Sequence, residues 1–500
     1  MTRAPISPPS QDARAPRWWV VTSLAVALVA PGVTPAGAQA ARPATYYVSP
    51  VGDDASAGRS ARAPWRTLTR ASAARFGPGD RLLLQGGASF PGPLLLGPDD
   101  GGVPDRPVTV GSYGRGRATV LGGTEQGVLA TNTAGLVIED LLVSGPGPDA
   151  SGRDGILAFT DRPTGVLEGI TVRDVEVTGF GHAGVAVGSW GGRGGFRDVL
   201  VERVTSHGNG RTGIHSYAQV PRAHRDVRIT RSRAYENRGV PGLSFNSGSG
   251  LALGGVDRGR IDHSVAYDNG GRDTAAEGPV GIWTYDSNRV VIEHNRSSRN
   301  RTGGPADGGG FDLDQNTSNS VLRFNVSREN DGAGYLSGNG PSTSVHRGNA
   351  IRDNVSEDDG RRNGYGGIQV WRRSAGLLVE RNVVRMRPSG SDSAAVWLYE
   401  LPAPTPEDGP VRFRGNAFVT TGGAPLVTLQ DSRAEGVHFG GNAYGTRGAP
   451  FRVDWNGTRY GSLQAWQGAT GQEADAAATR RARRVPSRRS PARRARPRRA

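Results

Sequence analysis

The sequence predicts an all-β fold, a right-handed parallel β-helix of about eleven coils with an N-terminal cap and a short C-terminal helix. Three observations predict it: apolar residues recur with a period near 30 residues, Gly and Asn recur at fixed places in each repeat, and no helical periodicity lies between them. Short strands at this period suit a solenoid, in which each coil buries its apolar side against its neighbours. A leucine-rich repeat has a shorter period, and a propeller needs about four strands in each blade, so both are disfavoured.

One apolar anchor residue marks the first strand of each repeat. Ten steps between anchors cover 301 residues, which gives the mean period of about 30. The segments VIEHNRSSRN at 291, VLRFNVSREN at 321 and AIRDNVSEDD at 350 show the kinship of the repeats. The anchors are Ile138, Val172, Val201, Ile229, Ile261, Ile292, Leu322, Ile351, Val379, Phe413 and Phe439.

Two columns of Asn residues follow this register. Asn tolerates the left-handed conformation and bonds its own backbone, so it suits a tight turn, and repetition in successive coils predicts stacked amide ladders. Three residues after the anchor lie Asn295, Asn325, Asn354, Asn382, Asn416 and Asn442. Eight residues after it lie Asn209, Asn237, Asn269, Asn300 and Asn330, followed by Asp359.

A second strand in each repeat opens with a small residue, usually Gly, that is followed by an apolar residue. Because strand side chains alternate between faces, these apolar residues are expected to point inward. They are Ile156, Val185, Ile214, Leu251, Ile282, Phe311, Tyr335, Ile368 and Val396.

Both ends of the chain differ from the repeat. Arg3, Arg14 and Arg17 precede a short apolar run, and A-x-A sites follow it, which is typical of a secretory signal peptide over residues 1–40. Residues 41–130 are expected to form the N-terminal cap and the first coils. Residues 131–473 are expected to form the parallel β-helix, which the segment SLQAWQGATGQ closes as a helix. Residues 474–500 are expected to be a disordered Arg-rich tail. We therefore expect a secreted, extracellular monomer with no membrane span after removal of the signal.

Composition limits the chemistry. The 500 residues include no cysteine and no lysine, so disulfides, thiolate metal sites and a lysine base are excluded. Most of the net charge of +15 comes from eleven arginines in residues 480–500 and an excess of two positive charges in the first forty residues, which leaves about +2 for residues 41–479. A nearly neutral body does not predict a nucleic-acid partner.

The segments YYVSPVGDD, PWRTL, PGDRLLL, GGGFDLD and NDGAGY resemble the secreted β-helix proteins of the pectate-lyase-like superfamily. The resemblance covers roughly residues 45–472. It implies the fold and a polysaccharide partner. The superfamily contains lyases, glycoside hydrolases, uronate epimerases and members without known catalysis, so fold alone does not choose the reaction.

Outward positions of the second strand are rich in aromatic and polar residues. In a parallel stack these positions lie on neighbouring strands about 4.8 Å apart, so we expect them to share one exposed strip. A flat aromatic face with a polar tip suits a sugar ring, although loops packed over these rings would explain them equally well. The expected substrate-binding residues are Tyr217, Trp283, Tyr285, Gln369, Trp371, Arg372, Trp397 and Tyr399.

Asp312 and Asp314 are the sharpest candidates for catalysis. Two positions apart on one strand, they are expected to project to the same exposed face, about 6.5–7 Å apart. In a hydrolase such a pair protonates the leaving oxygen and activates water or attacks the sugar. In a lyase carboxylates hold Ca²⁺ beside a base, so the group Asp307, Asp312, Asp314 and Asp331 is also a candidate calcium site. A turn-capping role for these aspartates is the structural alternative.

His215 is a further catalytic candidate on the same strip. The leading interpretation is a polysaccharide lyase or glycoside hydrolase that uses Asp312 and Asp314. The alternatives are a non-catalytic carbohydrate-binding β-helix, and a uronate epimerase that uses His215 or Tyr217. No cofactor is predicted other than the candidate calcium ion.

Overall fold

The computed structural model describes residues 42–340, 345–389 and 392–474. The chain divides into two compact units: unit 1 is Met1–Arg296 with Asn300–Gly308, and unit 2 is Ser297–Arg299 with Gly309–Ala500. The fold is an all-β parallel β-solenoid with about 13 turns. The predicted signal peptide and nearly all of the predicted Arg-rich tail lie outside the described residues.

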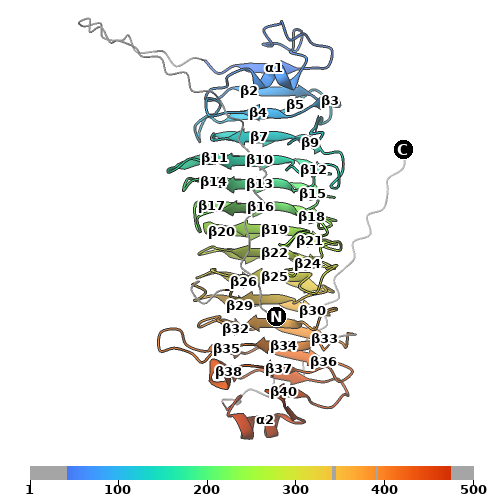
Figure 1. Ribbon diagram of the computed structural model, residues 1–500, viewed down its shortest axis with the longest axis vertical. Coiled ribbons are helices and arrows are strands. Elements are labelled where there is room, and N and C mark those ends of the chain that lie inside the picture. Colours follow the sequence, from blue (N-terminus) through green and yellow to red (C-terminus); the bar gives the residue numbers. More distant parts are fainter. Residues whose placement is uncertain (1–41, 341–344, 390–391, 475–500) are drawn as a thin grey trace, which may run out of the picture. The chain divides into compact units, whose positions relative to one another are not determined.

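Each coil contributes three strands, which we call sheet 1, sheet 2 and sheet 3 in chain order (Figure 1). The strands of sheet 1 contain the anchor residues. In unit 1 it contains β1 (Thr45–Val48), β2 (Arg81–Gln85), β5 (Val108–Tyr113), β8 (Leu136–Glu139), β11 (Val166–Arg173), β14 (Gly195–Glu202), β17 (His224–Thr230), β20 (Val256–Asp262) and β23 (Val291–Glu293). In unit 2 it contains β26 (Val321–Arg323), β29 (Ala350–Arg352), β32 (Leu378–Glu380), β35 (Val411–Arg414) and β38 (Val437–Gly440).

Sheet 2 consists of short strands that the sequence did not predict. In unit 1 they are β3 (Ser89–Pro91), β6 (Ala118–Leu121), β9 (Leu141–Ser144), β12 (Glu176–Thr178), β15 (Thr205–His207), β18 (Arg233–Tyr235) and β21 (Val265–Tyr267). The unit boundary falls within β24 (Arg296–Ser298). In unit 2 they are β27 (Val326–Arg328), β30 (Val355–Glu357), β33 (Val383–Met386), β36 (Ala417–Thr420) and β39 (Ala443–Gly445).

Sheet 3 contains the predicted second strands. In unit 1 these are β4 (Leu94–Leu96), β7 (Val128–Thr131), β10 (Ile156–Thr160), β13 (Ala183–Ser189), β16 (Thr212–Ala218), β19 (Ser249–Gly254) and β22 (Val280–Tyr285). In unit 2 they are β25 (Gly309–Leu313), β28 (Tyr335–Gly338), β31 (Gly366–Trp371), β34 (Ala394–Tyr399), β37 (Val427–Gln430), β40 (Val453–Trp455) and β41 (Thr458–Tyr460). The pairing of β40 with β41 is antiparallel.

The register follows the anchors within each unit. In unit 1, Val172 pairs with Ile138 and with Val201. In unit 2, Val379 pairs with Ile351 and with Phe413. The anchors are buried, so their stacked side chains form a continuous apolar core in each unit. The prediction of about eleven coils was slightly low, because the N-terminal coils that contain β2 and β5 precede Ile138, the first of the eleven anchors that were counted.

Asn ladders run along the turns, as predicted. In unit 1 the Nδ2 of Asn209 donates to Oδ1 of Asn237 at 3.0 Å, and Asn237 donates in the same way to Asn269 at 2.9 Å. In unit 2 a second ladder ends where Asn442 Nδ2 donates to Glu473 Oε1 at 2.6 Å. Each buried side-chain amide is thereby hydrogen-bonded to the next coil.

Short helices lie at both ends of the described chain. The N-terminal helix α1 (Leu68–Ser72) begins after Thr67, whose side chain accepts from the Arg70 backbone N–H. Near the C-terminus, α2 (Leu463–Thr470) buries Trp466 against Phe439 and Trp455, and a 3₁₀ helix spans Ala434–Gly436. Among the described residues no helix has the length and apolarity needed to cross a membrane.

Candidate functional site

The predicted outward positions share a register within each unit. In unit 1, Ala252 of β19 pairs with His215 of β16 and with Trp283 of β22. Tyr217 and Tyr285 occupy the next outward positions, where they pair with glycines of the preceding strands. In unit 2 the corresponding row runs through Asp312, Leu336, Gln369 and Trp397.

This row is not the exposed strip that the sequence predicted. The exposed fraction is only 5% for Trp283, 7% for Trp371 and 2% for Asp312, and Asp314 is also buried. Large rings gain free energy by leaving water, and here they lie against the sheet and its loops. The prediction that Asp312 and Asp314 lie on an exposed strand face is therefore wrong, because both residues are buried. Both positions nevertheless alternate with core residues, as expected.

Two glycines allow tyrosine rings to lie flat on sheet 3 of unit 1. A Cβ atom built on Gly188 would lie 2.3 Å from the Tyr217 ring, and one built on Gly254 would lie 2.2 Å from the Tyr285 ring. Each glycine is the residue that pairs with that tyrosine one coil earlier. The small residues in the outward row thus leave the space in which the rings of the following coil pack.

A cavity of about 130 Å³ opens beside these rings in unit 1. Four aromatic side chains line it, together with several polar ones. The aromatic residues are Tyr217, Phe245, Trp283 and Tyr285, and the polar residues include Asp154, His182, Arg211, His215 and Asn246.

Successive coils supply the polar side of the cavity. Asp154, His182 and Arg211 each lie one or two residues before the small residue that opens a strand of sheet 3. The His182 backbone N–H donates to Arg153 O at 3.0 Å, and the Arg211 N–H donates to His182 O at 2.9 Å. The repeat therefore stacks these positions as closely as it stacks the strands.

Several of these polar side chains have no hydrogen-bond or ion-pair partner among the described residues. Among the described residues, the side chains of His182, Arg211 and His215 form no hydrogen bond or ion pair. The Asp154 carboxylate accepts one hydrogen bond, from the Ala183 N–H at 2.9 Å. The Trp283 Nε1 is buried and has no partner in the described part of the chain.

Burial sets the ionisation of the cavity. It raises the pKa of Asp154 to about 6, against the lowering effect of the Ala183 hydrogen bond and of Arg211. Burial, aided by the positive charge of Arg211, lowers the pKa of His182 to about 3 and that of His215 to about 4. At neutral pH both imidazoles are therefore neutral, Asp154 is mostly ionised, and Arg211 is positive.

A loop of unit 1 between β18 and β19 covers part of the cavity with Phe245, whose ring centroid lies 5.0 Å from the Arg211 guanidinium carbon. Ser247, two residues on, anchors this loop. Its N–H and Oγ both donate to Asp273 Oδ1, at 3.0 Å and 2.6 Å. Burial raises the pKa of Asp273 to about 6, although these hydrogen bonds oppose the shift.

Asp312 and Asp314 lie in unit 2, on and just after β25. Phe311 and Leu313 alternate with them and are fully buried, so the two carboxylates leave the opposite face of the strand. Across the described residues no group of three or more His, Asp or Glu side chains is positioned to hold a metal ion. The candidate calcium site at Asp307, Asp312, Asp314 and Asp331 therefore finds no support.

The remaining predicted residues of unit 2 have structural contacts. The Arg372 guanidinium lies 4.1 Å from the centroid of the Trp371 ring, and its Nε donates to Glu400 at 2.8 Å. The Gln369 side chain accepts from the Gly366 N–H at 3.1 Å. Trp397 and Tyr399 are half-buried.

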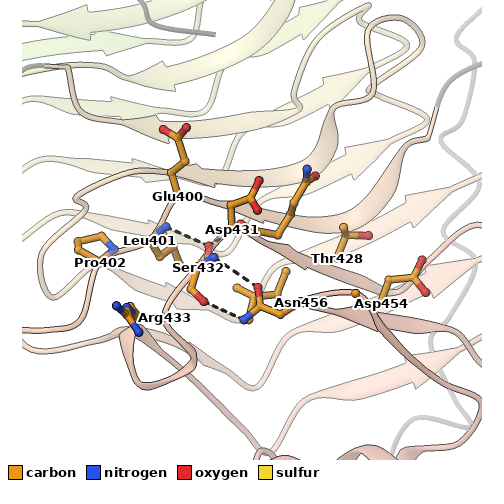
Figure 2. A pocket seen from close by; sticks show the side chains of 12 residues that line it. Glu400, Leu401, Pro402, Thr428, Asp431, Ser432, Arg433, Asp454 and Asn456 are labelled. Carbon is orange, nitrogen blue, oxygen red and sulfur yellow. Dashed lines mark hydrogen bonds between the residues drawn. The ribbon is translucent and has the colours of Figure 1, made fainter.

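A wider groove of about 890 Å³ lies over the last coils of unit 2. Figure 2 shows the side chains that line it. Two of its charged groups are paired: Glu400 accepts from Arg372, and Asp454 accepts from Arg459 Nε at 2.7 Å. The Asn456 side chain accepts from the Ser432 N–H at 3.3 Å and donates to Ser432 O at 2.8 Å, as the dashed lines in Figure 2 mark.

Sequence reasoning identified His215, Tyr217, Trp283 and Tyr285 but missed the other lining residues. Asp154, His182 and Arg211 had a detectable signal, since polar residues precede the opening small residue in three successive coils. Phe245 and Asn246 had none, because they belong to a long loop that is outside the repeat.

Comparison with known proteins agrees with this architecture. A family model for a right-handed β-helix region matches residues 164–304 and 242–384. A lacto-N-biosidase from Bifidobacterium longum subsp. longum is 47% identical over 73 residues, a stretch that spans 14% of this chain and only 5% of that enzyme.

Two solved structures are also similar. A GH136 lacto-N-biosidase from Eubacterium ramulus superposes with a TM-score of 0.52 at 17% identity, covering 74% of this chain and 67% of that one. The pectate lyase Pel9A gives a TM-score of 0.38 at 16% identity, covering 79% and 80% of the two chains. At these identities the superpositions concern the fold alone.

Proposed function

The chain is a right-handed parallel β-helix of the pectate-lyase-like type, and we propose that it acts on a saccharide chain as a glycoside hydrolase or polysaccharide lyase. Asp312 and Asp314 are the proposed catalytic carboxylates. The observation that carries the proposal is their spacing: Asp312 lies on β25 and Asp314 directly follows it, so the two carboxylates alternate with the core residues Phe311 and Leu313.

Two arguments favour hydrolysis over elimination. Carboxylates two positions apart on a strand are separated by about 6.5–7 Å, which is within the range of about 5–9.5 Å that acid–base pairs of glycosidases use. The short, strong match to a lacto-N-biosidase also favours glycoside hydrolysis. A lyase would need another base, because the chain contains no lysine.

A panel of neutral and acidic glycans tests this proposal, with reducing ends and ultraviolet absorbance read together. A hydrolase produces reducing ends without the absorbance of unsaturated products. Asp312→Asn and Asp314→Asn should each lower the rate by about 100-fold or more, since each removes a group that transfers a proton or attacks the sugar. Asp174→Asn, on the surface of unit 1, is the matched control. Unchanged cleavage in both Asp312 and Asp314 variants would reject the assignment.

Carbohydrate binding without catalysis is the second candidate, supported by the unpartnered polar groups of the unit 1 cavity. In that case no glycan is cleaved, but the protein is still retarded on a polysaccharide affinity gel. An epimerase that uses His215 or Tyr217 would instead change uronate configuration without cutting the chain. Product analysis by NMR separates these outcomes.

A further inference from the structure

We propose that the cavity of unit 1 is a binding site for one uncharged sugar ring, held by Arg211, Asp154 and Trp283. The saccharide class of the ligand rests on the proposed function. The lining residues all belong to unit 1, and neither proposed catalytic carboxylate is among them.

The unsatisfied polar groups are the first argument. Buried polar groups in proteins are nearly always hydrogen-bonded, and an unpaired one costs about 1–3 kcal/mol. Here the Trp283 Nε1 donor is buried and has no partner among the described residues. The half-buried side chains of Arg211, His182 and His215 line the cavity without a hydrogen bond or ion pair in the described part of the chain. A ligand rich in hydroxyl groups can satisfy these donors and acceptors together.

The shape of the cavity is the second argument. Its volume is about 130 Å³. An apolar cavity of roughly 150 Å³ accommodates benzene, so this cavity has the scale of one ring. The Trp283 and Tyr285 rings stack at 4.9 Å and, with Tyr217 and Phe245, form the apolar walls. Such walls fit the C–H face of a pyranose while the polar groups meet its hydroxyls.

The charge of the cavity is the third argument, and it selects an uncharged ring. Arg211 and Asp154 carry opposite charges but form no ion pair within the described residues, so each is available to a ligand. A uronate would gain from Arg211 but would lie beside the Asp154 carboxylate in a desolvated site, where like charges repel strongly. Hydroxyl groups suit both residues at once, since they donate to Asp154 and accept from Arg211.

Binding of small glycosides to the full chain tests the proposal at neutral pH. The probes are methyl β-D-glucopyranoside, methyl β-D-galactopyranoside and methyl β-D-glucuronide, measured by saturation-transfer NMR and calorimetry. At least one neutral glycoside should bind more tightly than the glucuronide. Arg211→Gln and Asp154→Asn should each weaken binding about tenfold or more, because each removes a charged hydrogen-bonding group.

Conservative and control variants keep the test independent of folding. Trp283→Phe retains an aromatic ring but removes the N–H donor, so it should weaken binding about fivefold. Arg203→Gln and Asp174→Asn alter an exposed ion pair of the same unit and should bind as the unchanged protein does. Circular dichroism identifies any variant that does not fold.

Three results would overturn the proposal: no neutral glycoside binds, the glucuronide binds most tightly, or the Arg211 and Trp283 variants bind normally. None of these depends on cleavage. Conversely, Asp312→Asn should abolish cleavage while small glycosides still bind in unit 1, so failure of the catalytic assignment and failure of the sugar site give different results.

Discussion

The charge of the unit 1 cavity depends on pH through Asp154. Its neighbours are the Ala183 N–H and the positive charges of Arg211 and Arg153, which favour the carboxylate, but burial outweighs them and raises its pKa to about 6. His182 and His215 also face the cavity, and their pKa values of about 3 and 4 keep them neutral over the range in which Asp154 titrates. Tyr217, whose pKa is raised by burial, stays protonated. Asp154 is therefore the residue of this group that changes charge near pH 6.

The affinity for a neutral glycoside should consequently fall as the pH falls through about 6. Above this pH the carboxylate accepts sugar hydroxyls, and below it the protonated group loses one acceptor and its charge, which should weaken binding about tenfold. Calorimetric titration between pH 7.5 and pH 5 measures this change. Asp154→Asn should bind weakly with no dependence on pH over the same range. A pH profile identical in the two proteins would show that another group is responsible.

At the scale of elements, the repeating sequence pattern predicts the strands that recur in each coil. The anchors pair as expected within each unit, and the opening Gly residues of sheet 3 set the row that contains His215 and Trp283. Sheet 2 was missed because its strands are only three or four residues long and follow directly on a turn. Exposure could not be predicted from alternation, because alternation distinguishes inward from outward positions but does not show which loops or rings cover the outward ones.

The loop between β18 and β19 illustrates this limit. Phe245 reaches the cavity from a loop in which Ser247 is bonded to Asp273, a residue 26 positions away in the chain. No local pattern of residues encodes that contact. The loop is therefore a tertiary feature that determines how enclosed the predicted row becomes.

Ser247→Ala should loosen this loop. Loss of the Oγ hydrogen bond to a buried carboxylate costs about 1–3 kcal/mol of local stability, so backbone amides near Phe245 should exchange hydrogen faster. Glycoside affinity should fall severalfold, because Phe245 forms one wall of the cavity. Hydrogen exchange by mass spectrometry, combined with calorimetry, measures both effects. Ser144→Ala is the control, since its Oγ makes only a 3.4 Å contact with Gly145 O. Normal exchange in Ser247→Ala would show that the loop is held by other contacts.

Across the whole chain, buried histidines shape the response to acid. Burial lowers the pKa of His224 and His346 to about 4, and His182 and His215 are lowered similarly. His224 shows the cause in detail: its Nδ1 accepts from the Phe196 N–H at 3.2 Å, while Nε2 lies 2.9 Å from Tyr217 O. Such an imidazole is held in one neutral tautomer, and protonation of Nδ1 would break the hydrogen bond from Phe196.

The sign of the pH effect follows from these shifts. A histidine whose folded-state pKa is depressed contributes stability that is complete above its unfolded value of about 6.5 and is lost as the pH falls toward 4. Asp154, Asp273 and Asp359 act in the opposite direction, because burial raises their folded-state pKa values to about 6 from 3.8. Their pKa shifts are smaller than those of the four histidines, so the histidines dominate between pH 6.5 and pH 4.

The melting temperature should therefore be highest near neutral pH and should fall steadily on acidification toward pH 4.5. Replacing His224 by Gln should lower stability at pH 7, because the packing of the ring is lost, but should flatten the decline, because one proton-binding group of the unfolded state has been removed. The exposed residue His438 provides the control, and His438→Gln should leave the slope unchanged. Calorimetric melting at intervals of half a pH unit measures the slope. A melting temperature that rises as the pH falls from 6.5 would mean that the buried aspartates, and not the histidines, govern the acid response.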